Sequence, residues 1–120
     1  MARVVALIPD LLFGSNVQGM LRAAGHEVQL TADPQVARAQ APMADLLILD
    51  LTTTEPDGAE LVRAMRAGDE LGSTRTLAFY SHVDAEARAR GEESGIELVV
   101  PRSRMAREAG ALVAGLTAGE

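Results

Sequence analysis

The sequence contains no cysteine, no lysine and no tryptophan, and its two histidines, His26 and His82, lie far apart. Without cysteine the chain has neither disulfides nor thiolate metal sites, and two separated histidines offer little to a zinc ion. Without lysine every basic side chain is an arginine, and its planar guanidinium does not replace an ammonium group one for one. A mechanism that needs a lysine is therefore excluded in its usual form.

Basic clusters and long apolar runs are also missing. The net charge is −6, and the eleven arginines form no cluster, which argues against binding to nucleic acid or to an anionic membrane. No apolar stretch approaches the roughly 20 residues that span a bilayer. The segment Met1–Ile8 is too short and too weakly charged for a signal peptide. We therefore expect a cytoplasmic protein that binds neither nucleic acid nor membrane.

Short apolar runs alternate along the chain with segments whose apolar residues recur three and four positions apart. The runs have the length of strands and lie at Val4–Ile8, Val28–Leu30, Leu46–Leu49, Leu77–Tyr80 and Ile96–Val100. The intervening segments predict five helices. Near-continuous apolar strands are typical of a parallel sheet that is buried on both faces. The sequence thus predicts an α/β domain over 1–116 and a short tail over 117–120. The expected fold is a doubly wound, flavodoxin-like (βα)5 three-layer sandwich with strand order 2-1-3-4-5.

Capping residues mark the expected helix ends. Asp33 precedes Pro34, which suits an N-cap followed by proline at the first helical position, and Ser103 is expected to cap the last helix. Helices are expected to stop at glycines, namely Gly25, Gly68 and either Gly91 or Gly95.

In a doubly wound sheet of this order, ligands bind beyond the carboxyl ends of strands 1 and 3. The first strand is followed by Asp10 and the third ends at Asp50, so this topology predicts that two carboxylates converge there. Asp50 either performs chemistry or terminates a strand. The apolar stretch Leu11-Leu12-Phe13 either packs over the first helix as a hydrophobic staple, which we favour, or presents a patch to a partner.

The stretch LLILDLTTTEPDGAELVRAMR resembles the central segment of the receiver domain of two-component response regulators, and the resemblance extends over essentially the whole chain. It implies that Asp50 occupies the phosphoacceptor position, with Gly58 eight residues later as in receivers. It also implies that Ser81 contacts the phosphoryl group. By the same resemblance, Mg²⁺ would be held by Asp10, Asp50 and the main-chain carbonyl of Thr52. The resemblance therefore predicts one pocket formed by Asp10, Thr52 and Ser81 around Asp50.

Two departures from the receiver pattern concern the chemistry directly. Pro9 stands where receivers have the first of two acids, and the fifth strand reads Val-Val-Pro-Arg where they have Lys-Pro. That lysine neutralises phosphoryl oxygens, and such electrostatic contributions usually dominate phosphoryl transfer. DLLFGSNVQGMLRAAGHEV is also similar to divergent receiver-like chains. We therefore interpret the chain as an atypical receiver, or pseudo-receiver, with little or no phosphorylation, no enzymatic activity and no required cofactor. The one ion that the resemblance implies is Mg²⁺, bound weakly at Asp10 and Asp50.

The expected partners are proteins: a histidine kinase, an output protein or a second copy. Arg102, Arg104 and Arg107 lie opposite the apolar stripe of the last helix and could meet an acidic partner where receivers dimerise. Two alternatives remain open. One is a phosphorylatable receiver with Asp50 as phosphoacceptor. The other is a small-ligand-binding flavodoxin-like domain, although PDLLFGSNV offers an FMN phosphate little beyond Gly14 and Ser15.

Overall fold

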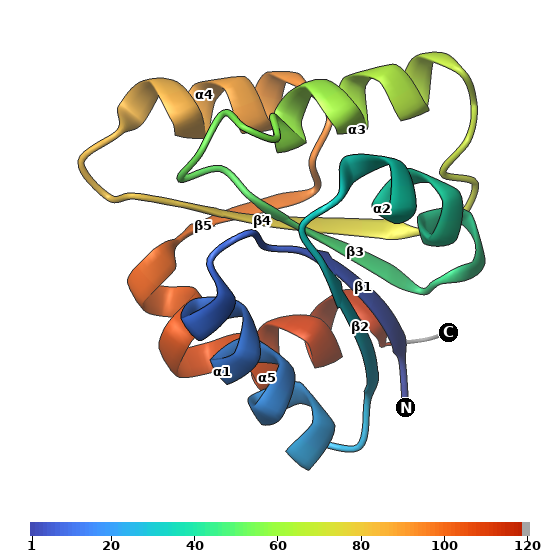
Figure 1. The fold of residues 1–120 in the computed structure, drawn as a ribbon, viewed down its shortest axis with the longest axis vertical. Helices are drawn as coiled ribbons and strands as arrows, with labels where there is room; N and C mark the ends of the chain where they lie inside the picture. The colour runs from blue at the N-terminus through green and yellow to red at the C-terminus, as the bar shows by residue number, and fades with distance from the viewer. Residues whose placement is uncertain (119–120) are drawn as a thin grey trace.

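Strands and helices alternate from one end of the chain to the other in a computed structural model that describes residues 1–118 (Figure 1). The strands are β1 (Arg3–Leu7), β2 (Glu27–Thr31), β3 (Leu46–Asp50), β4 (Arg75–Tyr80) and β5 (Leu98–Pro101). The helices are α1 (Leu11–Ala23), α2 (Pro34–Gln40), α3 (Gly58–Ala67), α4 (Ala85–Glu93) and α5 (Arg102–Thr117), with a 3-10 turn, η1 (Ala41–Met43), after α2. All strands pair in parallel in the order β2-β1-β3-β4-β5, which confirms the predicted fold class.

The sheet is covered on both faces. Figure 1 shows α1 and α5 on one side of it and α2, α3 and α4 on the other. Because side chains alternate along a strand, β3 supplies both cores. Leu46 and Ile48 pack into the core on the α1 and α5 side, whereas Leu47 and Leu49 pack into the core on the other side. All four are fully buried, which explains why the strand is a continuous apolar run.

Four of the five α-helices begin with an aspartate that caps the first turn. The carboxylates of Asp10, Asp33, Asp57 and Asp84 each accept a hydrogen bond from a main-chain N–H of α1, α2, α3 and α4. α5 differs, because β5 runs directly into it and Pro101 occupies its N-cap position without a side-chain hydrogen bond. The prediction that Ser103 caps this helix is wrong, since Ser103 already lies inside its first turn. The start of α5 therefore lacks the negative charge that the other helix starts have.

Two glycines show why the chain needs this residue at particular places. Gly95 follows α4 with a φ of +94°, in the left-handed region that other residues avoid, whereas Gly91 lies inside the helix. Of the two predicted ends of α4, Gly95 is therefore the correct one. At Gly58 the reason is space, because a Cβ atom there would lie 3.0 Å from the Cβ of Leu49. The third helix can thus begin close against the end of β3.

The carboxyl ends of β1, β3 and β4 lie along one edge of the sheet. Leu7 pairs with Leu49, and Asp50 pairs with Phe79 in the next strand. The residues that follow these strands are therefore brought together, as the predicted topology requires.

The last helix extends to Thr117, whose hydroxyl donates to the carbonyl of Val113 at 2.8 Å. The predicted tail thus starts within this helix, and its residues 119–120 lie outside the described part. Across residues 1–118, no helix combines the length and the apolar character that crossing a membrane would require.

Candidate functional site

Asp50 is the last residue of β3, and only 4% of its surface is exposed. Its Oδ1 atom accepts a hydrogen bond from the main-chain N–H of Thr52 at 2.8 Å and a second one from the hydroxyl of Thr52. A buried carboxylate needs such donors, because an unpaired charge would be costly in the interior. Asp50 is therefore held in place by the loop that follows it, and one of its two oxygens is already engaged by protein donors.

Asp10 is engaged through both of its carboxylate oxygens. Oδ1 caps α1 by accepting the N–H of Phe13 at 3.0 Å, and Oδ2 lies 3.3 Å from an Nη2 atom of Arg102. Arg102 is the first residue of α5 and lies 92 positions further along the chain. The ion pair thus joins the end of β1 to the end of β5, and the sequence alone did not indicate it.

The guanidinium of Arg102 also covers an aromatic ring. Its central carbon lies 4.3 Å from the ring centroid of Phe13, a cation–π arrangement, and this ring lies 4.9 Å from the ring of Phe79. Phe13 and Phe79 are buried, so the guanidinium has a rigid apolar floor. Arg102 is therefore positioned by Asp10 and Phe13 together rather than projecting freely into water.

A cleft of about 460 Å³ opens beside these residues, which we call the C-terminal cleft. It is lined by Phe13, Thr52, Ser81, His82, Arg102, Ser103 and Ala106. The structure thus brings together Thr52 and Ser81 from the predicted pocket residues. Asp10 lies next to the cleft through its pair with Arg102, whereas Asp50 is buried below Thr52 and does not line it.

The predicted interface arginines divide into two environments. Arg102 belongs to the C-terminal cleft, as described above. Arg104 and Arg107 both lie near Glu108 of the same helix, at 3.6 and 3.7 Å, with exposed side chains. Glu108 itself departs from helical geometry, with φ −126° and ψ 18°. The three arginines therefore do not share one set of contacts, although all three belong to the first half of α5.

The residues at this edge do not fit a Mg²⁺ ion well. Mg²⁺ is bound through one or two carboxylates with free oxygens, supplemented by water. Here Pro9 offers no side-chain oxygen, both oxygens of Asp10 already accept protein donors, and a guanidinium lies beside them. Among residues 1–118 no group of three or more acidic, histidine or cysteine side chains is arranged to hold a metal. The donor chemistry therefore favours the arginine over a divalent cation at Asp10.

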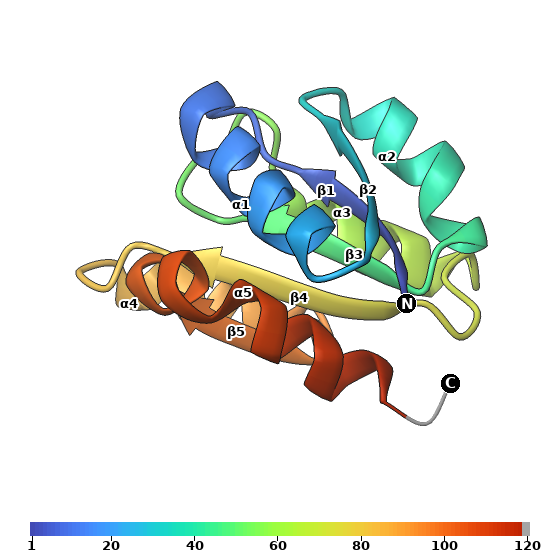
Figure 2. The same cartoon turned by 90° about the horizontal axis from the view of Figure 1, so that it is seen from below.

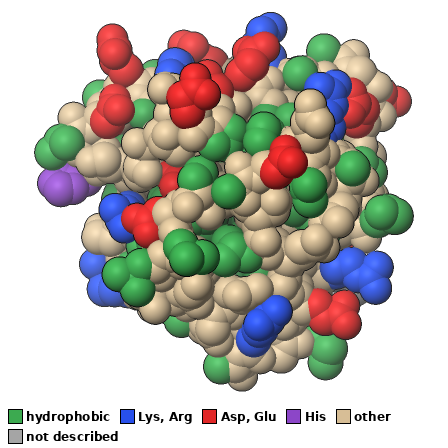
Figure 3. All heavy atoms as spheres, in the orientation of Figure 1, with side chains coloured by type: hydrophobic (Ala, Val, Ile, Leu, Met, Phe, Trp, Pro, Cys, Tyr) green, Lys and Arg blue, Asp and Glu red, His purple; other side chains and the backbone are tan. Residues whose placement is uncertain are grey.

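The stretch Leu11-Leu12-Phe13 is only partly folded inward. Phe13 is buried, but Leu11 and Leu12 are 75% and 74% exposed. The staple expected from the sequence is therefore wrong for the two leucines, because the cap at Asp10 turns them outward on the first turn of α1. Val83, in the loop before α4, is exposed as well. Figure 3 shows hydrophobic side chains gathered towards the centre of one face, with most charged ones towards its rim.

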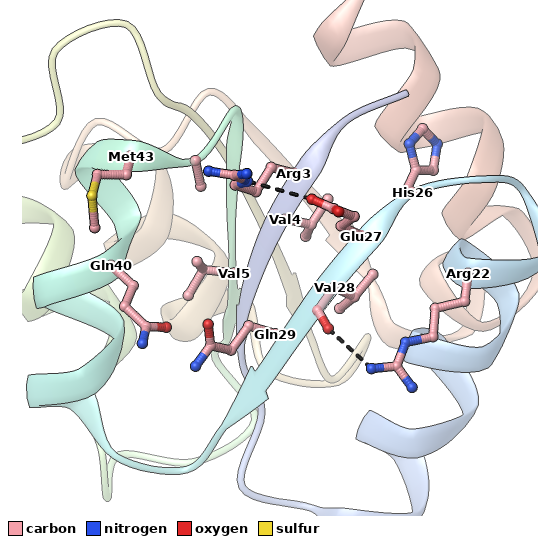
Figure 4. Close-up of a pocket in the computed structure, with 11 residues that line it drawn as sticks. Arg3, Val4, Val5, Arg22, His26, Glu27, Val28, Gln29, Gln40 and Met43 are labelled. Atoms are coloured by element: carbon pink, nitrogen blue, oxygen red, sulfur yellow. Dashed lines mark hydrogen bonds and ion pairs between the residues drawn. The ribbon is translucent and has the colours of Figure 1, made fainter.

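A second hollow, which we call the β2-edge groove, has a volume of about 540 Å³ and lies along the outer strand (Figure 4). Its basic residues already have partners: Arg3 pairs with Glu27 at 3.4 Å, and Arg22 donates to the carbonyl of Val28 at 3.4 Å. Gln40 contributes a buried Oε1 atom that accepts no hydrogen bond from the described residues. No pattern along the chain indicated this groove, since its residues come from five separate elements and from the segments between them.

No protein-family model and no curated protein sequence matches the chain. Solved structures do match over nearly its whole length. The receiver domain of a Francisella response regulator, 1452, has a TM-score of 0.83 at 16% identity and covers 98% of this chain and 97% of its own. The chemotaxis protein CheY4 of Vibrio cholerae has a TM-score of 0.81 at 24% identity, covering 97% and 98%. The receiver domain of the sensor histidine kinase PA1611 of Pseudomonas aeruginosa, which has magnesium coordinated in its active-site cleft, has a TM-score of 0.83 at 18% identity and covers 97% of both chains. The chain therefore has the fold of receiver domains.

Proposed function

We propose that this chain is an atypical receiver, a cytoplasmic signalling module that acts through contacts with other proteins and with little or no phosphorylation of Asp50. The observation that carries the proposal is the ion pair between Arg102 and Asp10, which uses the one acid available at the end of β1. The fold of receiver domains supports the signalling role. It does not by itself supply the chemistry, because function belongs to the site rather than to the fold.

Phosphoryl transfer to a carboxylate depends on positive charge placed where the phosphoryl oxygens develop charge. In this site the charge of Arg102 is offset by Asp10, and Pro9 adds no ligand for a metal. Asp50 also shares its Oδ1 atom with two donors of Thr52, which stabilise the carboxylate as it is. These contacts lower the capacity of Asp50 to act as an efficient phosphoacceptor.

The proposal is tested by exposing the full chain to beryllofluoride or acetyl phosphate with Mg²⁺. We expect no mass increase with acetyl phosphate and no change in the amide NMR spectrum with beryllofluoride, in the wild type as in Asp50→Asn. A double variant, Pro9→Asp with Arg102→Gln, provides a second carboxylate and removes the guanidinium. It should gain affinity for Mg²⁺. A Mg²⁺-dependent modification of the wild type that Asp50→Asn abolishes would instead identify a phosphorylatable receiver.

We further propose that Arg104 and Arg107 face the protein partner, whether a histidine kinase, an output protein or a second copy. Both side chains are exposed, and Glu108 only partly balances their two charges. For the second copy, sedimentation velocity of Arg104→Glu with Arg107→Glu should show weaker self-association than the wild type. Arg63→Glu on α3 is the matched control, since Arg63 is an exposed arginine that pairs with Glu60 on the opposite side of the sheet. Equal weakening by the control would place the interface elsewhere.

A further inference from the structure

We propose that the C-terminal cleft and the groove that continues it between α1 and α5 form a binding site for a small organic anion. In this site Arg102 holds the oxyanion head, with the hydroxyls of Ser81 and Ser103 beside it. The apolar body of the ligand lies along Phe13 and Met20. This inference rests on the proposed function in one respect: a receiver that is not phosphorylated needs another signal, and the bound anion would be that signal.

The polar end of this site consists of groups that suit an anion. Ser81 and Ser103 each bring a hydroxyl that can donate a hydrogen bond, His82 brings an imidazole, and Arg102 brings a guanidinium whose charge Asp10 balances only from one side. Among residues 1–118 no carboxylate lines the cleft, although the protein carries a net charge of −6. The hydroxyl of Thr52 is already committed to Asp50, so Thr52 separates the buried acid from the space above it. The cleft is thus a local exception to the acidic character of the chain.

Arg102 has donors to spare. A guanidinium carries five N–H groups in a planar fork, and only Nη2 lies within reach of Asp10, at a long 3.3 Å. The guanidinium packs against the ring of Phe13 at 4.3 Å, which reduces the side-chain freedom that binding would otherwise remove. A carboxylate or phosphate can accept two parallel hydrogen bonds from such a fork. The arginine is therefore oriented in advance for an oxyanion that approaches from the cleft.

The apolar end is a groove of about 330 Å³, which we call the α1–α5 groove. It is lined by Phe13, Asn16, Val17, Met20 and Ala106. Phe13 and Ala106 also line the C-terminal cleft, so the two hollows adjoin. Figure 2 shows α1 and α5 side by side, as their packing requires. Ligand sites commonly combine a mostly apolar wall with a few convergent polar groups, within roughly 300–1,000 Å³.

The neighbouring acids limit which anion can bind. Asp10 competes for Arg102, and Asp50 lies below Thr52, so a bare inorganic anion gains little. Burial of an apolar body adds a contribution that does not depend on charge, in proportion to the area removed from water. The site therefore selects an anion that carries an apolar group, and we expect such a ligand to bind about tenfold or more tightly than its inorganic head alone.

The test is an NMR titration of the isotope-labelled full chain at fixed ionic strength and without Mg²⁺. The probes are inorganic phosphate, phenyl phosphate and benzoate, so that the phosphate and carboxylate heads are compared on the same apolar body. We expect saturable shifts at Ser81, Arg102 and Ser103 with at least one aromatic probe, and weaker binding of phosphate. Equal affinity for phosphate and phenyl phosphate would overturn the role of the α1–α5 groove. The absence of saturable shifts with all three probes would overturn the site.

Matched variants separate this site from general charge effects. Arg102→Gln should lower the affinity for the aromatic probes at least tenfold. Arg104 lies on the same helix but outside both hollows, so Arg104→Gln should change this affinity by less than twofold. Ala106→Leu narrows the space where the two hollows meet, and it should lower the affinity for the aromatic probes more than the affinity for phosphate. Equal effects of the two arginine variants would overturn the assignment of Arg102. Asp50→Asn removes a nearby negative charge and should keep or strengthen the binding of the aromatic probes, whereas it would abolish any phosphorylation of Asp50. Failure of this site and phosphorylation of Asp50 would therefore be recognised separately.

Discussion

The C-terminal cleft and the β2-edge groove differ in what supports and surrounds their arginines. The β2-edge groove is the larger, at about 540 Å³ against about 460 Å³, but its arginines pair with Glu27 and with the carbonyl of Val28. Figure 4 shows these contacts along β2. In the C-terminal cleft, Arg102 lies over a buried ring beside hydroxyl groups, and it forms an ion pair with Asp10 at 3.3 Å. An aromatic support beneath the arginine and hydroxyl groups beside it, rather than volume, therefore distinguish the candidate site.

The two regions should first differ in how much each contributes to folding. Phe13→Ala removes a buried ring that contacts both Phe79 and Arg102, and we expect it to lower the free energy of unfolding by about 3 kcal/mol. Met43→Ala is the matched truncation in the β2-edge groove. Met43 is 70% exposed, so its loss should cost less than about 0.5 kcal/mol. Urea denaturation of both variants measures this difference, and similar losses would remove the structural contrast between the regions.

The ion pairs of the two regions should differ next. A double-mutant cycle of Asp10→Asn with Arg102→Gln should give a coupling energy of about 0.5–1 kcal/mol, since the guanidinium is also held by Phe13. Asparagine keeps the cap of α1, so the cycle reports the pair alone. The cycle of Glu27→Gln with Arg3→Gln should give nearly zero, because both side chains are mostly exposed. Equal coupling energies from urea denaturation would contradict the idea that Arg102 is specially positioned.

The smallest expected effect concerns one wall of the β2-edge groove. α2 is tied to the segment after α3 by a two-point contact of Arg38 with Glu70, and hydrogen bonding from Arg38 lowers the pKa of Glu70 below its usual 4.5. Because the folded pKa is lowered, the stability from this pair is present above pH 4.5 and is lost as the pH falls through the lowered pKa. The Arg38→Gln variant should therefore melt slightly below the wild type at pH 6.5, and this difference in melting temperature should shrink as the pH falls below 4.5. A difference in melting temperature that stays constant as the pH is lowered through the acid range would show that Arg38 acts through packing instead.

Local patterns were sufficient to predict the secondary structure and the sheet. The apolar run from Leu46 to Leu49 is readable as a strand buried on both faces, and Asp33 with Pro34 marks the start of a helix because the cap involves only neighbouring residues. Errors arose where two elements meet. Ser103 failed as a cap because β5 continues directly into α5. Leu11 and Leu12 failed as a staple because their direction depends on how Asp10 starts α1.

The candidate site was predictable only in part, for the same reason. The switch-point rule located the edge of the sheet where Asp10 and Asp50 lie, and the receiver resemblance placed Thr52 and Ser81 there as well. The role of Arg102 was not predictable, since its contact with Asp10 spans 92 positions and no local pattern indicates it. The partner surface at Arg104 and Arg107 stays a prediction.

The order of strands and helices, the parallel sheet and the edge at which its polar residues gather were all predictable from the amino-acid sequence. Periodicity, caps and topology rules act over short distances along the chain. The sequence also determined that no lysine serves the site. Which cation lies at this edge of the sheet, and what it contacts, depends on the tertiary structure. Packing of α5 against α1 brings Arg102 over Phe13 and beside Asp10, and such a meeting depends on the geometry of the whole fold.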